Sequence, residues 1–300
     1  MTSEMITADA AGVWNLGELP VNRVGFGAMR LTGSAAFHLG APSDREQSIA
    51  VLRKAVELGV NHIDTAAFYF SSLRSANELI NSALGPYSDD LVIVTKVGPH
   101  RDQHGEWGTP ARPDQLRGQV EENLRQLGRD HLDVVNLRRT GRQESIAEHF
   151  GALAELRDAG LVRHLGISGV GPHQLAEALE IAPVVCVQNR FAVDRPGPVG
   201  DEMLRICGER GIAFVPFYAV AGSSGPRGAT SDHDEAVLAV AGDHGVSPAQ
   251  VRIAWTLHQG PHVLAIPGTG NPGHLVENVA AGALRLTADE LKRLDDSRNG

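Results

Sequence analysis

The sequence predicts an α/β protein whose main part is one (β/α)8 TIM barrel. Eight short apolar segments rich in Val and Ile alternate with longer amphipathic segments over 300 residues, and barrels of this kind usually need about 250 residues. Apolar segments without polar alternation are typical of parallel strands that are covered on both faces. Strands that alternate with helices form right-handed β–α–β units, and eight such units can close into a barrel.

The predicted strands follow one another along the whole chain. They span residues 23–28, 60–65, 91–97, 132–138, 163–168, 183–189, 212–218 and 262–267. Helices are expected between them. One helix begins at Ser43 or Asp44 and closes at Gly59, and another has Pro113 in its first turn and stops at Gly128. Ser and Asp are frequent N-caps, Pro suits a first turn, and Gly commonly follows a last turn.

An open doubly wound sheet is the alternative to the barrel. Such a sheet usually carries a glycine-rich phosphate loop after its first strand. Here "GFGAMR" lacks the third glycine and does not lead directly into a helix, which favours the barrel. Residues 1–18 are expected to form an N-terminal tail and barrel cap, and residues 19–300 a single barrel domain. The start, "MTSEMITADAAG", has neither the basic nor the apolar part of a signal peptide.

Composition and charge argue against several kinds of partner. The formal net charge of −9 argues against nucleic acid and anionic membranes, and no apolar run approaches the roughly 20 residues of a membrane span. Cys186 and Cys207 lie in apolar patterns, which indicates reduced core cysteines of a cytoplasmic protein. The 13 histidines show no ligand spacing, so no metal site is expected. The sequence carries no signal for an oligomeric state.

Three polar residues stand at or just after the ends of neighbouring strands: Asp64, Tyr69 and Lys96. A buried lysine is costly unless it is paired, and Asp64 could pair with it. A lysine beside a phenol should also lower the pKa of that phenol from about 10. Each residue taken alone could be a turn cap, a core aromatic or an edge lysine. Their joint position at one rim of the barrel favours a proton-donating site with Tyr69 as the acid.

Two long loops also follow strands, at residues 98–112 and 219–231. In a barrel such loops lie at the carboxyl ends of the strands, where active sites are built. The Gly and Ser residues at 222–225 suit a phosphate cradle, or equally a mobile surface loop. Trp107 is expected to form an apolar wall of a substrate pocket.

Six segments together resemble the successive blocks of the aldo-keto reductase superfamily. They are "GVNHIDTAAFY", "VTKV", "LDVVNLR", "LGIS", "VCVQN" and "IPGTGNPGHLVENVAA". The resemblance runs from about Leu19 to Leu294, and its wording is nearest to a bacterial subgroup that includes pyridoxal reductase. It implies a TIM barrel that binds NADPH in extended form, and a catalytic tetrad of Asp, Tyr, Lys and His. Asp64, Tyr69 and Lys96 take the first three places, but Arg138 stands where the histidine is expected.

Arginine at the fourth place changes the expected chemistry. Its planar fork can donate hydrogen bonds with a permanent charge, so Arg138 could polarise a carbonyl or hold an anionic group of the substrate. It is not a practical proton shuttle. The alternative is that Arg138 points away from the site and forms an ordinary salt bridge.

The resemblance also implies positions for the cofactor. Asp64 is expected in both the catalytic and the cofactor-binding site. Gly27, Ala28 and Met29 are expected near the nicotinamide ribose. Ser168 and Gln188 are expected at the carboxamide, and Phe217 against the nicotinamide ring. Gly169 replaces an asparagine of the family, so one carboxamide contact is missing, and Tyr218 is taken as strand core. At the adenosine end the family's basic residues are absent. The candidates there are Gly268, Thr269, His274, Glu277 and Asn278, with backbone N–H groups of the helix start.

These residues predict an NADPH-dependent reductase that converts an aldehyde or ketone to an alcohol, with Tyr69 as the general acid. Two alternatives remain open: reduction of an activated C=C bond or an iminium at the same cofactor site, and an NADPH-binding regulatory barrel with little turnover. The substrate is expected to be a small carbonyl compound. Pyridoxal is the best single candidate, and a sugar or polyketide ketone fits equally well.

Overall fold

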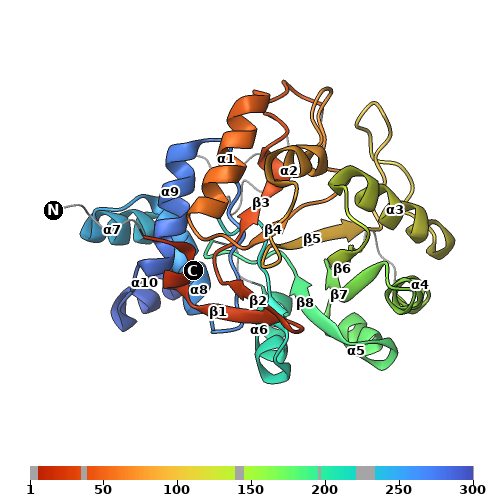
Figure 1. The fold of residues 1–300 in the computed structure, drawn as a ribbon. Helices are drawn as coiled ribbons and strands as arrows, with labels where there is room; N and C mark the ends of the chain where they lie inside the picture. Colours follow the sequence, from red (N-terminus) through yellow and green to blue (C-terminus); the bar gives the residue numbers. More distant parts are fainter. Residues whose placement is uncertain (1–5, 35–38, 139–144, 195–196, 221–233, 300) are drawn as a thin grey trace.

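A computed structural model describes residues 6–34, 39–138, 145–194, 197–220 and 234–299. Helices surround a central set of strands (Figure 1). Within the described ranges, no helix combines the length and the apolar character that crossing a membrane requires.

The central sheet is parallel, and neighbouring strands follow in chain order from β3 to β9. The strands are β3 (Phe26–Gly27), β4 (His62–Asp64), β5 (Val92–Val97), β6 (Leu132–Arg138), β7 (Val162–Ser168), β8 (Val184–Gln188) and β9 (Ala213–Phe214). All residues of β4 and β5 are buried, as expected for strands covered on both faces. Each matches one of the predicted segments, and the predicted (β/α)8 barrel is confirmed.

The segment in the place of the eighth strand closes the barrel through isolated β-bridges. Val263 pairs with Phe214, and Ala265 pairs with Val24, both in parallel orientation. The amide of Leu264 donates to the Phe214 carbonyl at 2.9 Å, and the amide of Gly25 donates to the Ala265 carbonyl at 2.8 Å. The segment predicted as residues 262–267 therefore connects the last strand to the first, although its pairing is too irregular to form a continuous strand.

Two glycines allow this closure near the cofactor positions predicted above. A Cβ on Gly27 would lie 2.6 Å from the carbonyl oxygen of Ile266, and a Cβ on Gly268 would collide with the carbonyl oxygen of Gly27. Only glycine permits such an approach of two backbones.

A β-hairpin closes the other end of the barrel. Strands β1 (Val13–Leu16) and β2 (Leu19–Asn22) pair antiparallel, so the hairpin crosses the predicted boundary between residues 18 and 19. Leu16 and Val21 are buried in one cluster with residues of the strands, among them Val134 and Leu264. The hairpin is the dark red ribbon that crosses the strands in Figure 1. It fills the amino-terminal mouth of the barrel with apolar side chains.

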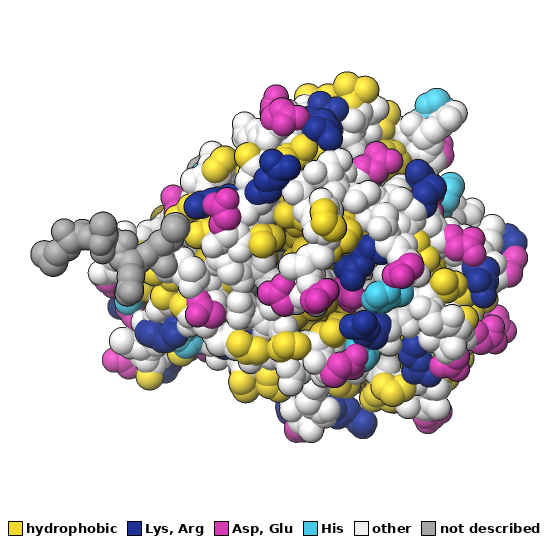
Figure 2. All heavy atoms as spheres, in the orientation of Figure 1, with side chains coloured by type: hydrophobic (Ala, Val, Ile, Leu, Met, Phe, Trp, Pro, Cys, Tyr) yellow, Lys and Arg dark blue, Asp and Glu magenta, His cyan; other side chains and the backbone are white. Residues whose placement is uncertain are grey.

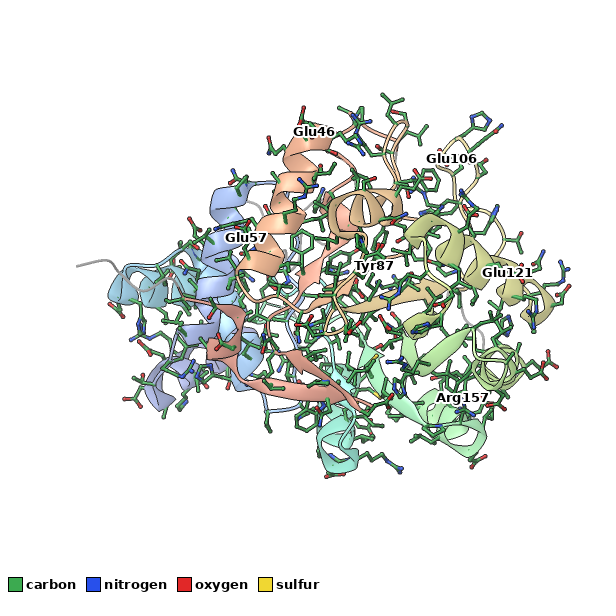
Figure 3. The ribbon with its side chains drawn as sticks, viewed as in Figure 1. Glu46, Glu57, Tyr87, Glu106, Glu121 and Arg157 are labelled. Atoms are coloured by element: carbon green, nitrogen blue, oxygen red, sulfur yellow. The ribbon has the colours of Figure 1, made fainter. Side chains whose placement is uncertain are left out.

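The helices form the outer layer. They are α1 (Arg45–Glu57), α2 (Ala76–Leu84), α3 (Leu116–Leu127), α4 (Ala147–Asp158), α5 (Pro172–Ile181), α6 (Pro198–Arg210), α7 (Glu235–His244), α8 (Pro248–His258), α9 (Pro272–Ala280) and α10 (Ala288–Asn299). The Asp44 side chain caps α1 by accepting from the Gln47 amide, and Gly128 ends α3 at φ 65°. Glu46 and Glu57 mark the two ends of α1, on the outside of the molecule (Figure 3).

The surface carries charges of both signs. Acidic and basic side chains are interspersed on the face seen in Figure 2. Both cysteines are buried, and burial raises the pKa of each thiol to about 12, so neither thiol is an activated nucleophile.

Candidate active site

A buried ion pair lies where β4 and β5 end. The two strands pair in register, with Asp64 opposite Val94. The Lys96 Nζ lies 2.6 Å from Asp64 Oδ1 and donates to the Thr65 carbonyl at 3.0 Å. Burial lowers the pKa of Lys96, and the neighbouring Asp64 carboxylate opposes that shift. The predicted pairing of Asp64 with Lys96 is therefore what the structure contains.

The second oxygen of Asp64 holds Gln188, at the end of β8. The Gln188 Nε2 donates to Asp64 Oδ2 at 2.7 Å, which fixes the orientation of the amide, because a carboxylate only accepts. The Gln188 Oε1 is then left buried without a hydrogen-bond partner among the described residues. An orphaned buried acceptor is costly, so this atom indicates a place for a donor from a bound molecule.

Tyr69 lies beside the ion pair in the loop between β4 and α2. Its side chain is buried, and the Lys96 Nζ is 5.1 Å from the centroid of its ring. The Tyr69 amide donates to the Ala66 carbonyl at 3.0 Å, and its carbonyl accepts from the Ala76 amide at 2.9 Å. This short loop therefore holds the phenol close to Asp64 and Lys96.

The prediction that the phenol has a lowered pKa is wrong for this arrangement. The pKa of Tyr69 is raised, first by burial and second by the negative charge of Asp64, while Arg138 opposes the shift. Because Lys96 is neutralised by its own carboxylate at 2.6 Å, the pair offers the phenolate little net positive charge.

Arg138 is the last residue of β6 and points into the site. Its Nη1 donates to Ser168 Oγ at 3.3 Å, and its Cζ lies 5.1 Å from the ring centroid of Phe217. No ion pair involves Arg138 in the described part of the chain, which disfavours the salt-bridge alternative. Gly98, in the turn after β5, packs directly on the backbone of Arg138. Its φ is 113°, and a Cβ at this position would lie 2.5 Å from the Arg138 carbonyl oxygen. A glycine is needed there.

One cavity of about 760 Å³ joins these residues to the start of α9. It is lined by the predicted residues Gly27, Met29, Asp64, Tyr69, Arg138, Gln188, Phe217, Gly268, Thr269, His274, Glu277 and Asn278. Ala28, Lys96 and Ser168 do not line it in the described structure; they lie behind its wall, and Ser168 contacts Arg138. The structure therefore brings most of the predicted cofactor positions to one cavity.

Two expectations about the cavity wall differ from the structure. Among the described residues that line the cavity Trp107 is not found; it packs on Phe68, which does line it, with ring centroids 5.8 Å apart. The proposed phosphate cradle at residues 222–225 lies outside the described residues.

The start of α9 offers fewer hydrogen-bond donors than its position suggests. The Asn271 side chain already accepts from the amides of Gly273 and His274, at 2.8 and 3.2 Å. The Thr269 hydroxyl accepts from the Asn271 amide at 3.0 Å and keeps its own proton for donation. Two of the first amides of α9 are therefore already satisfied by the Asn271 side chain.

Several residues of the cavity wall were missed from the sequence, among them Tyr218 and Arg30. Tyr218, taken there as strand core, lines the cavity with φ 63°, and such strained backbone often marks functional sites. Burial raises the pKa of its phenol to about 12. Arg30 also lines the cavity, directly after Met29. For Tyr218 the sequence did contain a signal. In the run "VPFYAVAGSSG", Pro216 and small residues interrupt the strand pattern, which indicates that the strand ends before Tyr218.

In the ranges that the structure describes, no three His, Cys, Asp or Glu residues gather in a way that could hold a metal ion.

Comparison with models of protein families assigns the chain to a family. Residues 23–299 match the model described as the aldo/keto reductase family, which is nearly the whole length. The chain belongs to the aldo-keto reductase family. The resemblance seen in the sequence blocks is confirmed, and with it the assignment of the protein as an oxidoreductase.

Among curated relatives, this aldo-keto reductase is 42% identical over 292 residues to a protein of Escherichia coli K12 named pyridoxine 4-dehydrogenase, covering 95% of this chain and 98% of the relative. It is 36% identical over 295 residues to an uncharacterised oxidoreductase of Schizosaccharomyces pombe, covering 98% of this chain and 92% of the relative. The name of the first relative agrees with the resemblance of the sequence segments to the pyridoxal reductase-like subgroup.

Solved structures agree with the fold. The thermostable aldo-keto reductase Tm1743, in complex with the inhibitor epalrestat, matches with a TM-score of 0.79 and 28% identity, covering 95% of this chain and 98% of the other. An aldo-keto reductase from Klebsiella pneumoniae in complex with NADPH matches with a TM-score of 0.75 and 26% identity, covering 92% and 91%.

Proposed function

We propose that the protein reduces an aldehyde to an alcohol with NADPH, and that Tyr69 is the general acid. The observation that carries this proposal is the buried Asp64–Lys96 pair beside Tyr69, next to a cavity of about 760 Å³ that extends to residues at the start of α9. The complex of a structural neighbour with NADPH supports the choice of cofactor.

The residues at the deep end of the cavity fit a nicotinamide. The orphaned Oε1 of Gln188 can accept from the carboxamide N–H, and the flat ring of Phe217 can cover one face. Thr269 and His274 would hold the adenosine end. When bound, NADPH supplies a hydride for the carbonyl carbon.

The protein supplies the proton for the carbonyl oxygen. Burial keeps the Tyr69 phenol protonated at neutral pH, since its pKa lies above the ordinary value, so the residue is ready to donate. As the phenol loses its proton, the positive charge of Arg138 stabilises the phenolate, because the charge of Lys96 is already matched by Asp64. Asp64 keeps Lys96 in place and charged through the 2.6 Å contact.

Arg138 indicates the kind of acceptor. A guanidinium fork can bind two neighbouring oxygens at once, whereas the histidine of the family pattern offers one donor. Pyridoxal carries an ionised ring oxygen on the carbon next to its aldehyde, so Arg138 could hold that oxygen and the carbonyl oxygen together. The name of the Escherichia coli relative supports pyridoxal as the substrate.

The test is NADPH oxidation with pyridoxal, followed by absorbance, for the wild type and for Tyr69→Phe. We expect the variant to lose at least about 100-fold in kcat, since general acid catalysis contributes about 10²–10⁴-fold. Its NADPH dissociation constant, measured by fluorescence, should stay within about twofold. A Tyr69→Phe variant that turns over at the wild-type rate would falsify the role of Tyr69.

Arg138 also favours a second candidate, reduction of an activated C=C bond or an iminium, because this site lacks the usual histidine. A panel of enones assayed beside pyridoxal and simple aldehydes separates the two. Turnover of enones alone would support the second candidate, and tight NADPH binding without turnover on any acceptor would indicate a regulatory barrel.

A further inference from the structure

The loop between β5 and α3 folds into a compact hairpin over residues 100–108. Arg101 pairs with Trp107 as an antiparallel bridge. The Asp102 amide donates to the Glu106 carbonyl at 3.0 Å, and the Asp102 side chain accepts from the Glu106 amide at 2.9 Å. Glu106 projects outward from this hairpin beside α3 (Figure 3). Because the hairpin is closed by its own hydrogen bonds, it can behave as one rigid unit.

The Arg101 side chain runs from this hairpin to the loop that carries Tyr69. It is only 6% exposed. Its Nε donates to the Gly105 carbonyl at 3.0 Å, within the hairpin, and its Nη1 donates to the carbonyls of Phe68 at 2.8 Å and Phe70 at 3.1 Å. The two carbonyls belong to the residues on either side of Tyr69. One guanidinium therefore holds the backbone of the candidate acid from both sides.

Aromatic contacts join the same parts. The Arg101 Cζ lies 4.2 Å from the ring centroid of Phe70 and 5.6 Å from that of Trp107. The Phe68 ring lies edge-on to the ring of Tyr69, with centroids 5.1 Å apart, and also contacts Trp107. Since Phe68 lines the cavity, a continuous set of contacts leads from the hairpin through the cavity wall to the phenol.

We infer that Arg101 is a positioning residue for Tyr69, and that it couples the 100–108 hairpin to the acid. This inference rests on the proposed role of Tyr69. The other backbone contacts of Tyr69 named above are single hydrogen bonds to Ala66 and Ala76, which fix one point each. Arginine suits the task because its planar guanidinium carries several donors and a permanent charge, and here it reaches three carbonyls from one side chain.

The test compares Arg101→Met with a matched control, Arg23→Met. Arg23 makes the same kind of contacts at the amino-terminal end of the barrel: it donates to the carbonyls of Val263 and Ala11, both at 3.1 Å, and to those of Leu257 and Gly260. Both variants should lower the melting temperature. Only Arg101→Met should lower kcat, by about 10- to 100-fold, since a displacement of about 1 Å at a catalytic group can cost that much. Its NADPH affinity should stay within about twofold.

Two readouts separate positioning from a general loss of structure. The solvent deuterium isotope effect on kcat should increase in Arg101→Met, because proton transfer from a displaced phenol becomes slower than the other steps. Arg101→Lys should recover part of the lost rate, since it keeps the charge and one donor. Arg23→Met should show the wild-type isotope effect.

Amide hydrogen exchange of residues 66–76 tests the inference without turnover. We expect at least about tenfold faster exchange in Arg101→Met than in the wild type, and no such change in Arg23→Met. Unchanged exchange in this segment, or a kcat that falls no more than in Arg23→Met, would overturn the inference. A wild-type protein that reduces no carbonyl would instead refute the proposed function, and the exchange comparison would still decide whether Arg101 fixes the Tyr69 segment.

Discussion

His62 should make the stability of the protein depend on pH between about 4 and 6.5. It lies on β4 two residues before Asp64, so its side chain points into the same barrel interior. The ring is 1% exposed and lies so close to Gly25 that a Cβ on that glycine would collide with it. Burial lowers the pKa of His62 to about 4, and the charge of Asp64 opposes the shift only in part.

The size and sign of the effect follow from linkage. In the unfolded chain the pKa returns to about 6.5, so between these values the unfolded state binds a proton that the folded state rejects. With respect to His62, the free energy of unfolding is therefore highest above about pH 7 and falls as the pH drops toward 4. At about 1.4 kcal/mol per pKa unit, the gap between 6.5 and about 4 corresponds to a loss of about 3 kcal/mol.

Urea unfolding at several pH values from 4.5 to 8 measures this contribution. His62→Gln removes the titrating group, so its free energy of unfolding should fall less than that of the wild type below pH 6.5. His104→Gln, at an exposed loop position, is the control and should follow the wild type. Equal pH slopes for the wild type and His62→Gln, with unchanged m-values, would refute the reasoning.

Two further predictions concern the cavity. Arg138→His restores the family histidine and should reduce kcat/KM for salicylaldehyde relative to benzaldehyde by about tenfold or more. The reason is the loss of a charge-assisted hydrogen bond from the guanidinium to the neighbouring phenol oxygen, worth about 1.5–3 kcal/mol. An unchanged ratio in steady-state assays would contradict two-oxygen binding by Arg138. Gly268→Ala places a Cβ on the Gly27 carbonyl oxygen, so it should lower the melting temperature and weaken NADPH binding, as followed by fluorescence titration. Gly242→Ala lies inside α7 and its Cβ meets nothing within 4 Å, so it should leave NADPH binding unchanged and should not lower the melting temperature.

The barrel and the meeting of Asp64 with Lys96 were predictable because both depend on local patterns. The apolar segments set the strands, and the order of parallel strands brings the ends of β4 and β5 to one rim. A lysine at such a buried position needs a carboxylate, and only a few residues at the neighbouring strand ends could supply one. The identity of the pair therefore followed from burial and topology together.

Other features depend on contacts that no local pattern contains. The β1–β2 hairpin was not predicted, although "WNLGELPVN" places a glycine in a two-residue connection, which is a hairpin signal. Arg101 looked like one more charge in a polar loop, because its three carbonyl partners come from two separate loops. Tyr218 looked like strand core because its left-handed backbone cannot be read from composition.

The pKa of Tyr69 shows why adjacency of charges is not enough to predict chemistry. From the sequence, Lys96 was expected to lower this pKa. In the structure the lysine charge is matched by Asp64, and burial then dominates and raises the pKa. Under the proposed mechanism reduction starts from the protonated phenol, which burial stabilises, and it leaves a phenolate beside the Asp64 carboxylate. Arg138 is then the group whose positive charge offsets that cost, which gives the replacement of histidine a physical reason.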